Sequence, residues 1–452
     1  MHFNIQIMKR RDFLRTAGIA TVGTVISANS GFGDIMAAEA VTRTRSGAWT
    51  GNSNTLKVGL IGCGGRGSGA AEQAMNADEN VVLSAMADAF KDQLDNSYDS
   101  LKKLFPQKVQ VANDHKFVGL DAYKKLIDSD VDVIILAAPP CFRPAHLEYA
   151  VNAKKHIFCE KPFAVDGPGM RRIIAAAQKA KAQGTELMSG FCWRYHIPKR
   201  ETFSRLLDGS IGKILAVEAS NNSGELWFHE RKSGWTDMEY KLRNWLYYNW
   251  LSGDHIVEQA IHSVDLMQWG MNDTLPSRVV ATGGRIKRTD PKYGNVYDHF
   301  GAKFEYPDGT KAYFSCKQQD NVAHSYGVEF VGEDGKCVVD CMNGQHYITG
   351  KNPWKYDDTF KFTDANAYKN AKVKSMYQQE HDELFAAIRN KTLINDFDWA
   401  ARSNLVALAA RMSAYTGQEV TMEQALCSDE KFFPEDLTLD TKYDLPVAIP
   451  GL

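Results

Sequence analysis

The stretch Lys57 to Gly67, KVGLIGCGGRG, restricts most strongly what this chain can fold into. Its aliphatic first half predicts a short buried strand, and its glycines predict a turn that other residues rarely tolerate. Gly62, Gly64 and Gly67 have the spacing G-x-G-x-x-G. In that spacing the first glycine allows a tight turn, the second lets a pyrophosphate approach the backbone, and the third lets a helix pack on the strand. A glycine turn with only a structural role is the alternative.

The residues after the turn favour a dinucleotide site. Residues 68–76 can continue as a helix whose N-terminus faces an anion, and VVLSAMAD reads as a second strand that ends at Asp88. An acidic residue about 20 positions beyond the glycines holds an adenosine ribose. We therefore expect the turn, including Gly65 and Arg66, and Asp88 to bind the cofactor. Asp88 would repel a 2′-phosphate and so favours NAD over NADP, a preference that a nearby Arg66 would soften.

The chain continues to alternate between strand and helix patterns. AYKKLIDSD predicts a helix, VDVIILAAPP a fully apolar strand and HIFCEKP a further strand. Such alternation predicts an α/β Rossmann domain, residues 55–189, with a doubly wound parallel sheet. Ligands bind beyond the carboxyl ends of these strands, which places Ala138, Pro139, Glu160 and Lys161 in the crevice with the glycine turn.

Composition limits the partners. The 452 residues are 44% hydrophobic and 24% charged, enough for two globular domains. The net charge of −2 gives no electrostatic case for nucleic acid. We therefore expect a small-molecule ligand.

The N-terminus predicts export. From Met8 the chain reads KRRDFLRT, an apolar run too short to span a bilayer, and then small residues suited to cleavage. The pair Arg10-Arg11 resembles a twin-arginine signal, so we expect residues 1–38 to direct the protein to the periplasm and to be removed, leaving no membrane anchor. Residues 39–54 then form a linker. A disordered basic tail is the alternative.

The cysteines predict neither a disulfide framework nor a zinc site. None of the eight lies in a Cys-x-x-Cys pair, and several lie in apolar runs, so we expect buried thiols.

Several of these features together resemble the Gfo/Idh/MocA oxidoreductases, the group of glucose–fructose oxidoreductase and inositol dehydrogenase. The resemblance runs from about Leu56 to Gln424 and rests on the glycine turn, Pro139-Pro140, His146 and above all Glu160-Lys161-Pro162. It implies that Lys161 lies between nicotinamide and substrate and hydrogen-bonds the hydroxyl that is oxidised, with His146 and Glu160 near the cofactor. A surface Glu-Lys pair is the alternative.

The resemblance also assigns residues of a second domain, 190–428. Trp193-Arg194-Tyr195-His196 corresponds to the crossing into this domain. It implies that Arg194 reaches the cofactor and that Tyr195 contacts the substrate.

GDHIVEQAIHSVDLMQW reads as one helix that carries a candidate base. Glu258 and His262 are four residues apart and so share a face, with His255 and Asp265 near the same stripe. A histidine held by a carboxylate suits proton removal from an alcohol. In the family an aspartate precedes this histidine by four residues, and Glu258 stands in its place; we expect His255 and His262 to contact substrate. A core histidine is the alternative, and a metal site is weaker still, so we expect no metal.

An aromatic segment, residues 223–250, contains Trp227, Trp235, Trp245 and Trp250. Such rings stack on sugars, but they equally suit a core or a subunit interface. Beyond it, strand patterns separated by Pro-Asp-Gly and Glu-Asp-Gly predict an open, mostly antiparallel sheet in an α+β domain, followed by amphipathic helices that return to the first domain. The resemblance implies a dimer or tetramer through this sheet. The tail, residues 429–452, is expected to wrap the surface.

Three functions follow. The first is an exported oxidoreductase that acts on a secondary hydroxyl of a sugar, sugar derivative or polyol. In it Lys161 and His262 polarise and deprotonate the hydroxyl, Glu258 orients His262, and NAD(P) stays bound between turnovers. The second is an NAD-dependent glycoside hydrolase or lyase with no net redox change. The third is a sugar-binding protein on an inactive scaffold.

Overall fold

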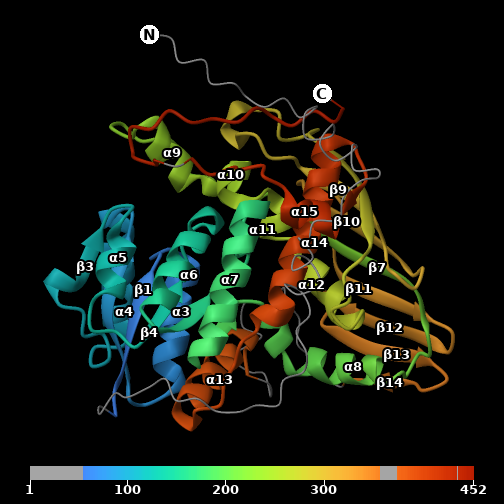
Figure 1. Cartoon of the computed structure of the whole chain (residues 1–452), viewed down its shortest axis with the longest axis horizontal. Helices are drawn as coiled ribbons and strands as arrows, with labels where there is room; N and C mark the ends of the chain where they lie inside the picture. The colour runs from blue at the N-terminus through green and yellow to red at the C-terminus, as the bar shows by residue number, and fades with distance from the viewer. Residues whose placement is uncertain (1–53, 357–373, 435, 452) are drawn as a thin grey trace, which may run out of the picture.

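The computed structural model describes residues 54–356, 374–434 and 436–451 (Figure 1). The predicted export signal and nearly all of the predicted linker lie outside the described residues. In the described part of the chain, no helix combines the length and apolar character needed to cross a membrane.

The first half of the described chain forms a six-stranded parallel sheet in the order β3-β2-β1-β4-β5-β6. Its strands are β1 (Leu56–Ile61), β2 (Val81–Asp88), β3 (Lys116–Val118), β4 (Val133–Leu136), β5 (His156–Cys159) and β6 (Leu187–Ser189). Its helices are α3 (Gly65–Ala77), α4 (Lys91–Leu104), α5 (Ala122–Ile127), α6 (Arg143–Asn152) and α7 (Gly167–Gln183). Every residue of β4 and β5 is buried because helices cover both faces of the sheet. The predicted doubly wound parallel sheet is confirmed.

The second half is built on a nine-stranded sheet in the order β14-β13-β12-β11-β7-β10-β9-β8-β15. Its strands are β7 (Ile214–Ser223), β8 (Arg278–Gly284), β9 (His299–Glu305), β10 (Lys311–Gln318), β11 (Ser325–Gly332), β12 (Gly335–Asp340), β13 (Gln345–Gly350), β14 (Trp354–Lys355) and β15 (Val420–Thr421). Exposed and buried residues alternate along β10, as expected for a sheet with one face on the core. The predicted antiparallel character is confirmed, with one exception, because β7 and β10 pair in parallel.

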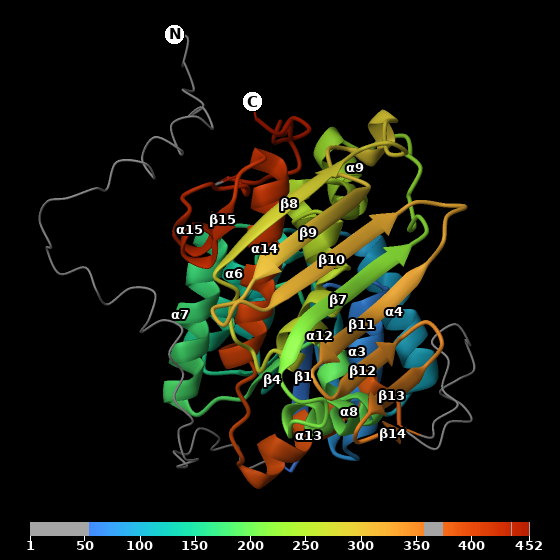
Figure 2. The same cartoon turned by 90° about the vertical axis from the view of Figure 1, so that its right-hand side faces the viewer.

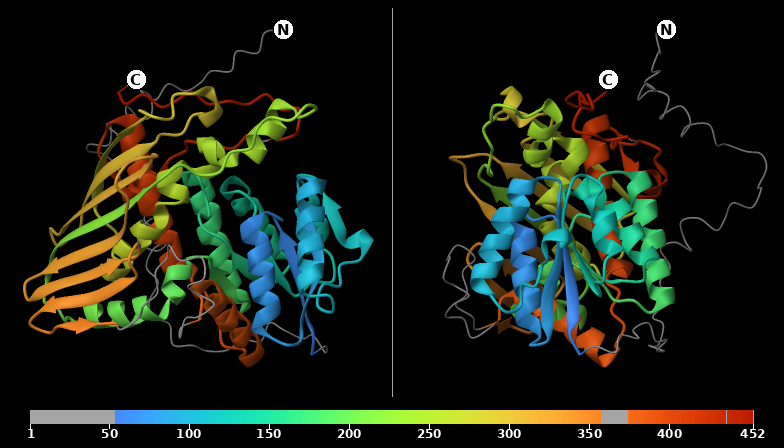
Figure 3. Two further views of the ribbon diagram at one scale, coloured as in Figure 1. Left: turned by 180° about the vertical axis from the view of Figure 1, so that it is seen from behind. Right: turned by 90° about the vertical axis from the view of Figure 1, so that its left-hand side faces the viewer.

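Helices fill the space between the two sheets, and within the described part of the chain one face of the large sheet carries no helix (Figures 2 and 3). They are α8 (Ile197–Leu207), α9 (Asp237–Arg243), α10 (Asn249–Ser252), α11 (His255–Glu258), α12 (Ile261–Gly270), α13 (Met376–Asn390), α14 (Phe397–Thr416) and α15 (Met422–Cys427). Short 3-10 turns lie at Asn113–His115, Pro140–Phe142, Cys192–Tyr195, Trp245–Tyr247 and Pro291–Tyr293. As predicted, helices from the end of the chain return to the first domain: α13 packs on α3, and α14 packs on α7.

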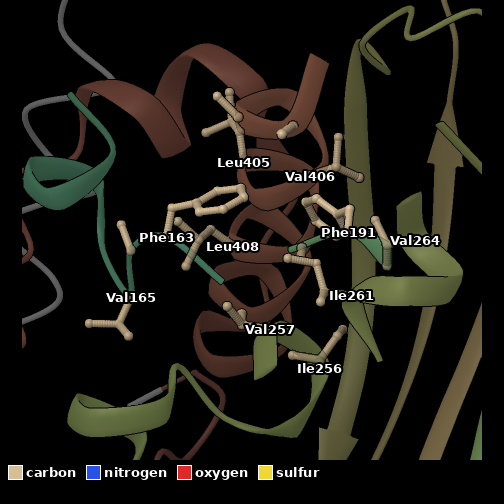
Figure 4. Packing of buried hydrophobic residues seen from close by; sticks show 14 of the residues in the cluster. Phe163, Val165, Phe191, Ile256, Val257, Ile261, Val264, Leu405, Val406 and Leu408 are labelled. Carbon is tan, nitrogen blue, oxygen red and sulfur yellow. The ribbon is translucent and has the colours of Figure 1, made fainter. Parts of the chain in front are cut away.

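One hydrophobic cluster joins the two domains (Figure 4). Phe163, just after β5, and Phe191, just after β6, meet Leu405 of α14 and Ile261 of α12, and all four are fully buried. Because the cluster draws on both halves of the chain, it fixes the first sheet against the helices that carry the candidate base.

The cysteines are as predicted at seven of eight positions. All eight lie in the described part of the chain as free thiols; seven are buried, and Cys427 is exposed. Burial raises the pKa of the Cys159 thiol to about 12, so this thiol stays protonated at neutral pH.

Candidate active site

The glycine turn between β1 and α3 contains two kinds of glycine. Gly62 has φ of +93°, and a Cβ on Gly67 would lie 1.9 Å from the carbonyl oxygen of Gly62. Both are therefore required by the turn and by its packing on α3. Gly64 and Gly65 differ, because a Cβ added to either would have no described residue within 4 Å. Their open surface lies at the N-terminus of α3, where a phosphate would fit against backbone N–H groups.

A cleft of about 640 Å³ extends from this turn along the carboxyl ends of the strands. The lining residues predicted from sequence are Gly62, Gly64, Gly65, Arg66, Gly67, Asp88, Ala138, Pro139 and His146, joined by Glu258 from the second domain. The volume lies within the range of cofactor and ligand sites. These walls suit a dinucleotide, since open glycine backbone and an acidic strand end lie in one cleft.

Asp88 ends β2 at one side of this cleft. Its carboxylate accepts hydrogen bonds from the backbone N–H of Cys63 (2.7 Å) and of Phe90 (2.9 Å), which hold it beside the turn. Burial raises the pKa of Asp88 despite these bonds. A carboxylate at this place suits the hydroxyls of an adenosine ribose.

Arg66 also lines the cleft, but its guanidinium is held on the protein side. It donates to Glu160, to Gln73 (2.8 Å) and to Glu380 of α13 (2.8 Å). An arginine already committed to two carboxylates has little capacity left for a 2′-phosphate. The structure therefore does not support the expectation that Arg66 softens the preference set by Asp88.

His146 of α6 is stacked on Tyr123, with ring centroids 4.1 Å apart. Burial, aided by the charge of Arg143, lowers its pKa to about 3, so the ring is neutral. Both of its nitrogens are buried, and neither has a hydrogen-bond partner among the described residues. His146 therefore forms part of the cleft wall, but its nitrogens are not exposed to the cleft.

Lys161 follows β5 and points toward the second domain. Its ammonium donates to the main-chain oxygen of Glu258 (2.7 Å) and contacts the Glu258 carboxylate (3.1 Å). Each side chain is only 13% exposed. The contact therefore fixes the lysine at the junction of the two domains, beside the cleft that Glu258 lines.

The candidate base does not lie on one continuous helix, which corrects the prediction from sequence. The segment breaks into α11, which ends at Glu258, and α12, which begins at Ile261. The break turns Glu258 toward Lys161, so the predicted pairing of Glu258 with His262 is wrong. The Nδ1 atom of His262 is buried and has no hydrogen-bond partner in the described chain.

His262 is nevertheless partly exposed, and the charge of Lys161 acts on it. Its ring stacks on Trp193, with centroids 5.3 Å apart. Burial, followed by the charges of Lys161 and Arg66, lowers its pKa well below the ordinary value. His262 is therefore neutral near pH 7 and can accept a proton.

Four other residues predicted from the sequence do not line the cleft. Glu160 was expected in the crevice, but it is buried and accepts a hydrogen bond from Arg66. Arg194 is bound to Asp265 (2.9 Å) and Asp273 (2.6 Å), and its guanidinium lies over Trp399. Tyr195 donates to Asp396 (2.6 Å) and is buried. His255 is buried against Phe300 with centroids 5.0 Å apart.

Local backbone geometry explains why Arg194, Tyr195 and His255 lie outside the cleft. The 3-10 turn at Cys192–Tyr195 directs Arg194 and Tyr195 to buried carboxylates, and the break after α11 leaves His255 facing the large sheet.

Sequence reasoning did not place the aromatic segment, which contributes to the cleft. Trp227, His229, Leu242, Arg243 and Trp245 line it opposite the glycine turn. By contrast, Trp250 is completely buried. The density of aromatic residues marked the segment as unusual, but nothing in its pattern showed which rings face the cofactor cleft.

The fold and this cleft define a two-domain dinucleotide-binding protein. Residues 56–188 match the family described as oxidoreductase family, NAD-binding Rossmann fold, and residues 201–338 match the GFO/IDH/MocA C-terminal domain. The chain therefore belongs to the Gfo/Idh/MocA oxidoreductase family, and its first domain is an NAD-binding Rossmann domain.

Named relatives are distant. The chain is 25% identical over 231 residues to 2,7-anhydro-N-acetylneuraminate hydratase of Escherichia coli, covering 51% of this chain and 57% of the relative. It is 29% identical over 223 residues to inositol 2-dehydrogenase of Salmonella paratyphi B, covering 48% and 55%. These matches thus span little more than half of each relative's own length.

A solved structure supports the fold. Aldose-aldose oxidoreductase from Caulobacter crescentus, solved in complex with glycerol, aligns with a TM-score of 0.62 at 19% identity, covering 81% of this chain and 100% of that one.

Proposed function

We propose that this protein is an exported oxidoreductase that oxidises a secondary hydroxyl of a sugar, sugar derivative or polyol with a retained NAD. The observation that carries the chemistry is the placement of Lys161, which is held by Glu258 at the edge of the nucleotide cleft and whose charge acts on the neutral His262. The relatives named for a polyol and a sugar acid support the substrate class.

The residues of this chain divide the work. The Lys161 ammonium donates a hydrogen bond to the substrate hydroxyl and stabilises negative charge that develops on its oxygen. His262 accepts the hydroxyl proton, because its lowered pKa keeps the ring neutral. Glu258 positions Lys161. The dinucleotide, when bound against Gly64, Gly65 and Asp88, supplies the acceptor for the hydride.

Replacing Lys161 by methionine tests this assignment. The change removes the ammonium but keeps a chain of similar length, so we expect turnover to fall by about 10²- to 10⁴-fold while NADH binding, measured by fluorescence titration, persists. Lys179→Met is the matched control, because Lys179 is bonded to Asn152 on the surface of α7. Full activity in Lys161→Met with a panel of polyols and sugars would contradict the proposal.

Export and retention of the cofactor form the second part of the proposal. Free dinucleotide is scarce outside the cytoplasm, so an exported enzyme must keep its cofactor and restore it in the same site. We expect near-stoichiometric NAD(H) on protein recovered from the periplasm after dialysis. Loss of the dinucleotide on a desalting column, with activity returning only on its addition, would contradict this part.

A redox-neutral reaction is the second candidate, and the hydratase relative favours it. A hydrolase or lyase of this kind would oxidise and re-reduce one sugar within a single turnover. Release of free sugar from aryl glycosides without an added acceptor would support it. Reduction of a carbonyl co-substrate without such release would support the oxidoreductase.

We also propose that the protein forms a homo-oligomer in which copies associate through the large sheet. One face of this sheet is free of described helices (Figure 2), and Val280 of β8 and Tyr313 of β10 are exposed at positions that alternate with the buried residues of their strands. Exposed apolar side chains on a broad sheet face suit an interface between copies. A monomeric mass in light scattering would contradict it.

A further inference from the structure

The aromatic segment crosses one end of the nucleotide cleft. Leu242 and Arg243, at the end of α9, line the cleft together with Asp88, Phe90 and Gln93 of the first domain. In Figures 1 and 3 α9 lies over the first domain, although it belongs to the second half of the chain. Because Asp88 marks the ribose position, this is the adenosine end of the cleft.

Arg243 joins the two walls of this end. Its guanidinium donates two hydrogen bonds to Asp92, in the first turn of α4, at 3.0 and 2.8 Å. It also lies 4.0 Å from the centroid of the Phe90 ring and 4.6 Å from that of Trp235. The Arg243 side chain is 9% exposed and that of Asp92 is 54% exposed. The contact therefore combines a bidentate ion pair with cation–π stacking on one ring from each domain.

Helix α9, which carries Arg243, is also bonded to the C-terminal tail. Glu239, which lies one turn before Arg243, accepts a hydrogen bond from it (2.9 Å). Thr236 donates to the main-chain oxygen of Leu439 (2.7 Å), and Lys241 donates to that of Tyr443 (2.6 Å). The C-terminal tail also accepts hydrogen bonds from Asn295 and Tyr297, so it ties α9 to the second domain. If the two walls separate at this end, the contact between Arg243 and Asp92 breaks.

We propose that Arg243 and Asp92 form an interdomain latch that slows the escape of the dinucleotide from the adenosine end of the cleft. The inference rests on the proposed function and assigns the retention of cofactor to particular residues. A ligand held beneath such a contact leaves only when the latch opens, so its dissociation rate contains the opening equilibrium. Arg243 is a positioning residue in this account.

The test measures the dissociation rate of NADH directly. Protein loaded with NADH is mixed with excess NAD, and the loss of NADH fluorescence is followed for wild type, Arg243→Ala, Asp92→Ala and the double variant. We expect each single change to raise the rate about tenfold, the scale of an ion pair with stacking, and the double variant to add little because both changes open one contact. Arg231→Ala is the matched control, since Arg231 pairs with Asp237 in the same segment but does not line the cleft.

The outcomes separate this inference from the proposed function. Unchanged dissociation rates in Arg243→Ala and Asp92→Ala would overturn the latch while leaving cofactor retention in place. Rapid release from wild type, with still faster release from both variants, would support the latch and overturn retention. Equal acceleration by Arg231→Ala would overturn the latch, because it would show a general loosening of the segment. Circular dichroism confirms that each variant is folded, and the exposed Asp92 allows a test without altering α9.

Discussion

Arg194→Ala distinguishes the role predicted from sequence from the role seen in the structure. The resemblance implies that Arg194 reaches the cofactor, whereas the structure buries it between Asp265 and Asp273. Although burial opposes its charge, these carboxylates raise the pKa of Arg194. The variant leaves Asp265, whose side chain is 1% exposed, with the hydrogen bond from Ser403 (2.8 Å) but without its cation.

The size of the loss follows from the orphaned carboxylate. Breaking a buried ion pair from one side costs about 3–5 kcal/mol. A second estimate gives a similar size. If Asp265 takes up a proton in the folded variant and so avoids a buried unpaired charge, the protonation costs about 4 kcal/mol at pH 7 for a carboxyl whose unfolded pKa is about 3.9. At pH 5 the same step costs about 1.5 kcal/mol. The folded pKa of Asp265 is raised in the variant, so stability is lost as pH rises, and the penalty is larger at pH 7 than at pH 5.

Urea unfolding at both pH values, followed by tryptophan fluorescence, measures this difference. NADH titration at low temperature, where the variant is folded, should give an affinity close to that of wild type. Arg172→Ala is the control, because its pair with Glu148 is 48% exposed on each side and should cost less than about 1 kcal/mol. Wild-type stability at both pH values combined with lost NADH affinity would refute the reasoning and restore the role implied by the resemblance.

Two further predictions concern the glycine turn and the buried histidines. Gly64→Val should abolish NADH binding while leaving the melting temperature within about 2 °C, because its side chain enters open space where phosphate would lie; wild-type affinity in Gly64→Val would contradict the placement. Burial, and then the charge of Lys199, lowers the pKa of His346 to about 2. Histidine in the unfolded chain has a pKa of about 6.5, so below that pH the unfolded state binds more protons than the folded state. The contribution of His346 to stability should therefore fall by about 1.4 kcal/mol for each pH unit of acidification. His346→Gln should reduce the change of the urea midpoint with pH between pH 6.5 and 5. His324→Gln, at an exposed position, should not. Equal slopes in wild type and both variants would contradict this prediction.

The sequence by itself determined the first domain and its side of the cleft. The glycine spacing, the acidic end of β2 and the apolar β4 each depend on a few neighbouring residues, and local pattern is sufficient where strands are buried and alternate with helices. For the same reason the hairpins of the large sheet were predicted from their turns. The parallel pairing of β7 with β10 was not predicted, since it joins residues 95 positions apart, such as Ala216 and Lys311, and leaves no local pattern.

Only the tertiary structure decided how the second domain meets the cofactor cleft. A helical pattern placed Glu258 beside His262, but the break between α11 and α12 gave Glu258 to Lys161. Arg194 was assigned to the cofactor, yet the buried Asp265 and the partly exposed Asp273 hold it elsewhere. The physical reason is the same in each case. The partner of a charged side chain is set by which group compensates its burial, and that group comes from a distant part of the chain.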